Sequence, residues 1–207
     1  FQMPFSGQRD LIEPLLPWGI DKSLPPAPQI FLESSAEEKA LEKVSSLKRP
    51  FFTLAPSAAY FLKRWPKDYW KDLIQLLPDF DFVLLGGPED QFLKDIQAIA
   101  PGRCLNLAGA LDYKTNAAII RKSKALVSND TGLMHIAEQL GHPCIALLGP
   151  APFGFPSRPS TLKMELPLSC RPCSKHGQGP CVNPIHQQCL VDIKPSTVAN
   201  ELLKWTR

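Results

Sequence analysis

The sequence predicts an α/β protein built on a doubly wound parallel sheet. Five short apolar segments alternate with amphipathic helical patterns between residues 50 and 149. Strands that are apolar on both faces are typical of a parallel sheet that helices cover on both sides. With 207 residues, of which 44% are hydrophobic, the chain can bury the core of one large domain.

Each expected strand is an apolar run that ends at turn residues. We expect the five strands at 50–57 (PFFTLAPS), 80–87 (FDFVLLGG), 103–109 (RCLNLAG), 124–130 (KALVSND) and 143–149 (PCIALLG). Apolar residues recur at helical spacing between them. The connecting helices are therefore expected at 66–77, with Pro66 as the first helical residue, and at 88–100, 113–122 and 131–140.

Two further helices flank this alternating region. The segment 34–47 (SSAEEKALEKVSSL) is expected to be helical, with Ser35 as the N-cap and Glu38 completing a capping box. A closing helix is expected from Pro195 to Trp205. We expect residues 1–33 to be a linker, or the remnant of a preceding segment, and residues 34–207 to form one domain.

Several classes of protein are disfavoured. A net charge of +3 is too small to indicate a nucleic-acid partner, and no apolar run approaches the roughly 18 residues of a membrane span. The first residues lack the features of a secretion signal, and the chain starts without Met, so we expect a fragment or a processed piece. P-loop and dinucleotide-binding glycine motifs are both missing from the sequence.

Prolines cluster in two places. The chain has 22 prolines, and they gather at Pro4–Pro28 and at Pro143–Pro184. Both clusters are typical of irregular connecting segments.

Polar residues follow three of the expected strands. The first loop carries Ser57, Lys63 and Arg64, the second is GGPED (86–90), and the third is NDTGLMH (129–135). In an open parallel sheet, ligands bind outside the carboxyl ends of the strands. The connectivity therefore predicts that these three loops converge on one binding site.

The third loop opens a helix in a way that suits an anion. A helix N-terminus attracts phosphate through its N–H groups and its partial positive charge. Gly132 leaves the backbone accessible, Thr131 adds a hydroxyl, and His135 lies on the same helix face. Lys63 could add a mobile positive charge from the first loop. Together these groups suit a diphosphate.

Taken singly, each of these residues has a simpler explanation. Asp130 alone is more easily understood as a helix N-cap, and a lone His135 as a half-buried histidine. Gly86-Gly87 is compatible with a tight turn, and Lys63-Arg64 with a solvated pair. Their common place on one edge favours the site.

Four cysteines form a separate pattern. Cys170, Cys173, Cys181 and Cys189 lie in the loop 168–190, with His176 and His186 nearby. Four thiols with one C-x-x-C can hold a tetrahedral structural zinc ion, but the spacing is looser than in a zinc ribbon. Zinc, free thiols and disulfides all stay open, and no metal ligand is assigned. The remaining two, Cys104 and Cys144, are expected in the core.

Several segments together resemble a known family. LAPSAAYFLKRWP, VLLGGPED, NLAG, SNDTGLMHIAEQLGHPCIALLGP and the late CRPC resemble, in this order, the C-terminal half of the ADP-heptose:lipopolysaccharide heptosyltransferases of glycosyltransferase family 9. The resemblance runs from about Pro50 to the end. It implies a Rossmann-like domain that forms one half of a GT-B glycosyltransferase.

The resemblance also implies roles for residues. The implied donor-binding residues are Ser57, Lys63, Glu89, Asp130, Thr131, Gly132 and His135. Lys63 matches the phosphate-contacting lysine and Glu89 the acidic residue near the nucleoside. Leu133 and Met134 could add apolar contact, although packing is the simpler role.

For the full-length enzyme, the resemblance implies transfer of a heptose from an ADP-sugar to a lipopolysaccharide-core acceptor. No cofactor is expected in the chemistry. The acceptor domain and the catalytic base are expected outside this chain. The implied location is the bacterial cytoplasm, with at most peripheral contact with the inner membrane. Two alternatives stay open: another GT-B nucleotide-sugar enzyme such as an epimerase, and a non-catalytic nucleotide-binding or zinc-stabilised module.

Overall fold

The fold is organised around a six-stranded parallel sheet. The computed structural model describes residues 13–20, 27–151, 158–174 and 176–206. The strands are β1 (Phe51–Ala55), β2 (Asp81–Leu84), β3 (Cys104–Asn106), β4 (Leu126–Asn129), β5 (Cys144–Leu147) and β6 (Thr161–Met164). They are arranged in the order β3-β2-β1-β4-β5-β6. The strand order therefore reverses between β1 and β4, which is the topological switch point of a doubly wound sheet.

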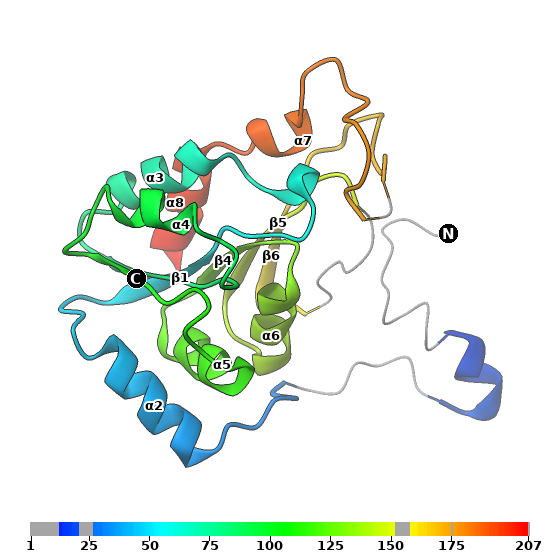
Figure 1. Cartoon of the computed structure of the whole chain (residues 1–207). Coiled ribbons are helices and arrows are strands. Elements are labelled where there is room, and N and C mark those ends of the chain that lie inside the picture. The colour runs from blue at the N-terminus through cyan, green and yellow to red at the C-terminus, as the bar shows by residue number, and fades with distance from the viewer. Residues whose placement is uncertain (1–12, 21–26, 152–157, 175, 207) are drawn as a thin grey trace.

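Helices cover both faces of this sheet (Figure 1). One side carries α3 (Lys67–Leu76), α4 (Leu93–Gln97) and α8 (Pro195–Lys204), and the other carries α2 (Ser34–Val44), α5 (Tyr113–Lys122) and α6 (Gly132–Leu140). The short elements are the 3-10 helices η1 (Glu13–Trp18) and η2 (Phe61–Lys63) and the helix α7 (Gln188–Val191).

The sheet separates two hydrophobic cores. Successive residues of a strand point to opposite faces, and on β4 Val127 packs into the core that contains Trp70 of α3. Its neighbour Leu126 packs into the core that contains Ile119 of α5. Because both faces are buried, the strands read as continuous apolar runs.

The five predicted strands are confirmed, each shorter than its predicted range, but a sixth was missed. β6 lies within the proline cluster Pro143–Pro184 that we interpreted as irregular, and it pairs in parallel with β5. On this short edge strand only Thr161 is buried, and Lys163 is exposed. The alternation of Leu162, Met164 and Leu166 with polar residues was the available signal, and its place inside a proline-rich stretch hid it.

The starts of α2, α3 and α4 differ from the prediction. α4 begins at Leu93 rather than near residue 88, because the Asp90 carboxylate bonds back to Gly87 N and holds this stretch in turns. α2 begins at Ser34 with an extended Glu33 as its N-cap and no side-chain capping bond, so the predicted capping box is wrong. Pro66 is the N-cap of α3 rather than its first helical residue.

The segment before α2 contacts the domain. Gln29 N donates to Gln139 O of α6 at 2.7 Å, and Ile30 and Leu32 pack against the core beneath α2, α5 and α6. The end of the predicted linker 1–33 is thus packed on the domain. Residues 1–12 and 21–26 of that prediction lie outside the described residues.

A buried polar network joins β1 to the ends of α5 and α6. The hydroxyls of Thr53 and Ser123 lie 3.2 Å apart, and Ser123 Oγ lies 3.2 Å from His142 Nε2. Burial lowers the pKa of His142 to about 4. The imidazole is therefore neutral in the folded protein at neutral pH.

This burial predicts a pH-dependent stability. Unfolded His142 takes up a proton below its usual pKa of 6.5, whereas the folded state resists protonation until about pH 4. The unfolded state binds more protons in this window, so stability falls as the pH falls through it. Denaturant titrations from pH 7 to 4 should show a loss on the order of 2–3 kcal/mol that His142→Gln lacks. Equal pH dependence of both proteins would contradict this assignment.

Candidate functional site

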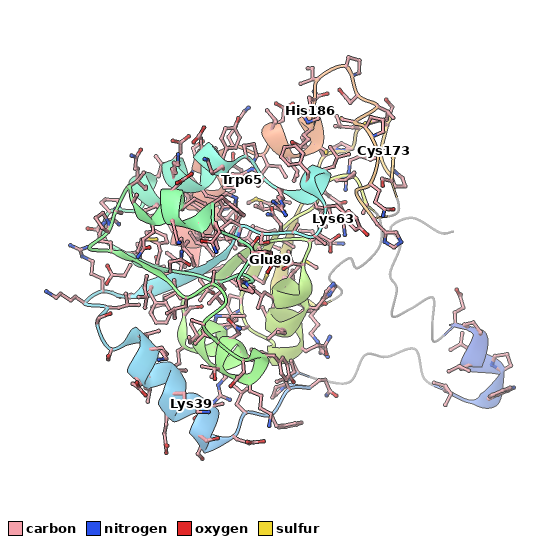
Figure 2. All side chains as sticks on the ribbon, viewed as in Figure 1. Lys39, Lys63, Trp65, Glu89, Cys173 and His186 are labelled. Atoms are coloured by element: carbon pink, nitrogen blue, oxygen red, sulfur yellow. The ribbon has the colours of Figure 1, made fainter. Side chains whose placement is uncertain are left out.

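A cavity opens at the carboxyl edge of the sheet, beside the switch point. It has a volume of about 320 Å³. It is lined by residue 55 at the end of β1, 57–59 after β1, 85–87, 89 and 90 after β2, the N-cap and first turns of α6 (131–133 and 136), and Asn116 of α5. The three loops predicted to converge thus share one cavity. In Figure 2, Glu89 lies at this edge near the centre of the molecule, whereas Lys39 lies far from it on α2.

The start of α6 forms one wall of this cavity. Thr131 is the N-cap, and its Oγ1 accepts from Leu133 N at 3.3 Å. The interpretation of Asp130 as the cap is wrong, because the extended residue that precedes the helix is Thr131. A Cβ added to Gly132 would meet no atom within 4 Å. The positive end of α6 therefore opens onto free space.

Lys63 and Asp130 form an ion pair near the same edge. Lys63 Nζ lies 2.7 Å from Asp130 Oδ2, and the two side chains are only 14% and 7% exposed. The lysine predicted to be a mobile cation is instead held by a carboxylate. A ligand phosphate at this place would have to share Lys63 with Asp130.

Asp90 joins the first and second loops. Its Oδ1 accepts from Ser57 Oγ at 2.7 Å, and its Oδ2 accepts from Gly87 N at 2.8 Å. A Cβ on Gly86 would lie 2.8 Å from the same carboxylate, so a glycine is needed there. Asp90 is 4% exposed, while its neighbour Glu89 is exposed and lines the cavity. Asp90 fixes the loop and leaves Glu89 available to a ligand.

The profile of the family described as "Glycosyltransferase family 9 (heptosyltransferase)" matches residues 6–183. The chain belongs to glycosyltransferase family 9. It is 30% identical over 203 residues to lipopolysaccharide heptosyltransferase 2 of Escherichia coli K12, a match that covers 94% of this chain and 55% of the relative. It is 32% identical over 205 residues to the protein of that name from Salmonella typhimurium LT2, again covering 94% and 55%.

A solved structure confirms the Rossmann-like, GT-B type of fold predicted for this family 9 chain. The E. coli ADP-heptose lps heptosyltransferase II superposes with a TM-score of 0.70 at 28% identity, covering 88% of this chain and 55% of that one. The chain thus spans about half the length of the relatives it matches. No helix in the described part of this family 9 chain is long and apolar enough to cross a membrane.

The remaining predicted residues of this family 9 domain differ in their relation to the cavity. His135 is half-buried on α6 and does not line it, whereas Leu133 does. Met134 is fully buried, so it packs in the core as the simpler interpretation held. Arg64 donates from Nε to Ala58 O at 2.8 Å, which braces the first loop.

Asn129 is a site-forming residue that the sequence analysis missed. It is fully buried; its Oδ1 accepts from Trp65 N at 3.0 Å, and its Nδ2 donates to Pro56 O at 2.7 Å. The side chain thereby fastens the end of β4 to the loop after β1. The sequence did carry a signal for this role. Asn129 is a polar residue at the end of an apolar strand, directly before the Asp-Thr-Gly turn. Asn116 was also missed, and a position inside a helix gives no such signal.

Two of the six cysteines of this family 9 chain lie in core strands, as the sequence suggested, and four lie near its C-terminal end. Cys104 and Cys144 are confirmed as core residues, and burial raises the pKa of Cys104 to about 12. All six cysteines are free thiols. Among the described residues, no three His, Cys, Asp or Glu side chains are grouped closely enough to hold a metal ion as they stand. The rings of His176 and His186 lie 6.4 Å and 6.3 Å from those of Tyr60 and Phe61.

Replacing Asn129 with Ala should strongly destabilise the domain. The change leaves a buried N–H and a buried C=O without partners, and each costs about 1–3 kcal/mol. We expect the free energy of unfolding to fall by about 2–4 kcal/mol in urea titrations. Asn200→Ala on the exposed face of α8 is the matched control and should change it by less than about 0.5 kcal/mol. Similar values for the two variants would refute the role of Asn129.

Proposed function

We propose that the chain is the donor-binding domain of a family 9 glycosyltransferase and that it binds an ADP-sugar, with ADP-heptose as the donor. The observation that carries the proposal is the cavity at the switch point, which joins the start of α6 to the exposed carboxylate of Glu89. A diphosphate would lie against the helix N-terminus. Glu89 would accept hydrogen bonds from the ribose hydroxyls.

The charges around the start of α6 support a diphosphate there. An ammonium group has three donors, so Lys63 can keep its bond to Asp130 and donate to a phosphate oxygen as well. Thr131 and Gly132 line the cavity at the positive end of the helix. Ser57 and His135 complete the proposed donor-binding set.

For the whole enzyme we propose transfer of the heptose to a lipopolysaccharide-core acceptor in the bacterial cytoplasm, with at most peripheral contact with the inner membrane. The names of the relatives, lipopolysaccharide heptosyltransferases from bacteria, support this substrate class. No cofactor is required, because the helix end, Lys63 and His135 can offset the negative charge that grows on the departing ADP. The general base is proposed to lie outside these residues.

Filling the space in front of Gly132 should weaken ADP binding without unfolding the domain. A Gly132→Val side chain meets no protein atom at Cβ, but it would occupy the place proposed for the diphosphate. Losing a hydrogen bond to a charged group costs about 1.5–3 kcal/mol, so the Kd for ADP should rise roughly 10- to 100-fold in calorimetric titration.

The matched control is Gly102→Val. A Cβ at Gly102 also meets nothing within 4 Å, and this glycine lies between α4 and β3, outside the residues that line the cavity. Its Kd for ADP should be unchanged. Unaltered ADP affinity in Gly132→Val would show that the diphosphate does not bind at this helix.

The chain alone should bind ADP-heptose without glycosylating an acceptor. Asp130 is paired with Lys63, Asp90 accepts from Ser57, and Glu89 is proposed to hold the ribose, so none of these carboxylates is proposed as the base. Glycosyl transfer needs a base that deprotonates the acceptor hydroxyl. Incubation with ADP-heptose and a lipid A–Kdo acceptor should release ADP slowly and give no glycosylated product. Product formation would place the base within residues 1–207.

A further inference from the structure

Four cysteines from separate parts of the C-terminal loop line one small cavity. Cys170, Cys173, Cys181 and Cys189 meet beside Leu62 of η2. The cavity has a volume of about 10 Å³, which is about the room that one water molecule needs. Of the six cysteines, all four that lie outside the core strands therefore face a space the size of a single ion.

Polar groups around this cavity are aimed at sulfur. Asn183 Nδ2 donates to Cys170 Sγ at 3.4 Å, and Gln187 N donates to Cys181 Sγ at 3.3 Å. Arg171 lies between the first two cysteines in the chain, and its Nη2 donates to Glu165 Oε2 at 3.1 Å. N–H donors stabilise thiolates, and they are the outer partners that orient metal ligands.

The loop is also anchored so that the cysteines stay together. Arg171 donates from Nε to Gly149 O and from Nη1 to Leu166 O, both at 2.7 Å. Cys173 N donates to Pro150 O at 3.2 Å. Both ends of the C-x-x-C segment are therefore fixed to the backbone that follows β5 and β6.

We propose that Cys170, Cys173, Cys181 and Cys189 form a tetrathiolate site for one thiophilic divalent metal ion, with zinc as the probe. The donor set suits the ion, because four cysteine thiolates form closed structural zinc sites. The sulfurs are not drawn together in this state, so binding moves them inward. The four thiol protons pass to solvent, and four sulfur–metal bonds form.

The cysteine loop also makes hydrogen bonds to the segment that carries Lys63. Gln187 Nε2 donates to Phe61 O at 3.1 Å, and Gln178 Nε2 donates to Tyr60 Oη at 3.1 Å. Gly177 has a φ of +81°, and a Cβ there would lie 2.9 Å from Lys63 Cγ. Figure 2 places Lys63, Cys173 and His186 in the same part of the molecule. A metal that orders the cysteine loop would therefore also order η2 and its lysine.

This coupling rests on the proposed donor site, whereas the metal site does not. Metal binding should strengthen ADP binding because it would hold the η2 segment, from which Lys63 reaches Asp130, more firmly in place. Measuring metal content and ADP affinity separately keeps the two proposals distinguishable. Lys63→Ala should retain the metal and lose ADP affinity.

The test is metal analysis of the purified, reduced chain after zinc loading and desalting. About one zinc per chain is expected. Removal of one thiolate in Cys181→Ser should lower zinc affinity by more than the 10- to 100-fold that outer-shell changes typically cost. Cys104→Ala, which removes a core thiol, should bind zinc as the wild type does. Asn183→Ala keeps all four thiols and should weaken zinc by about 10-fold, and circular dichroism checks the fold of each variant.

To test the coupling, zinc is removed from the wild-type chain with a chelator under reducing conditions and is then added back. Stripping should raise the Kd for ADP by about 5-fold or more, and zinc should restore it. A folded wild-type chain that retains no zinc, or Cys181→Ser with wild-type zinc affinity, would overturn the metal site. One zinc per chain with identical ADP affinity in both states would overturn the coupling alone.

Discussion

The pairing of β1 with β4 is the constraint on which the rest of the structure depends. These strands lie side by side in parallel, with Thr53 opposite Leu126 and Ala55 opposite Ser128, although two other strands separate them in the chain. From β1 the chain crosses on one face of the sheet to β2, and from β4 it crosses on the other face to β5. The crossover helices α3 and α6 therefore leave the edge on opposite faces. The cavity lies at this switch point, between the loops after β1 and β2 and the start of α6.

Keeping that space open requires buried polar groups to be paired. Asn129 is fully buried, Asp90 nearly so, and the Lys63–Asp130 pair is mostly withdrawn from water. An unpaired buried polar group would cost about 1–3 kcal/mol, so each bond between loops also fixes the position of a loop. The loops after β1, β2 and β4 are held together before any ligand arrives, and the ligand does not have to order them.

The sequence predicts the features that depend on periodicity and fails where they depend on contacts. Five strands and the convergence of three loops follow from apolar runs and chain order. β6 alternates apolar with polar residues inside a proline-rich stretch, so it gives no continuous apolar run. The Lys63–Asp130 pair joins residues that are distant in the chain, so no local pattern predicts it. Thr131 rather than Asp130 caps α6 because of a one-residue difference in where the backbone becomes helical. The donor-binding roles of the seven predicted residues stay a prediction.

The ion pair explains how a carboxylate can be part of a site proposed for a diphosphate. Two unit charges 4 Å apart interact by about 4 kcal/mol at an effective dielectric constant of 20. Bare Asp130 would therefore repel a phosphate more strongly than a helix N-terminus attracts one, since that attraction is worth at most about 2 kcal/mol. Lys63 Nζ lies 2.7 Å from Asp130 Oδ2, so the pair carries no net charge. The local electrostatic potential is then set by the positive end of α6. Asp130 then fixes the ammonium group at the mouth of α6 and keeps it from extending into solvent. The carboxylate of Asp130 thus positions the ammonium group of Lys63 beside the proposed phosphate site.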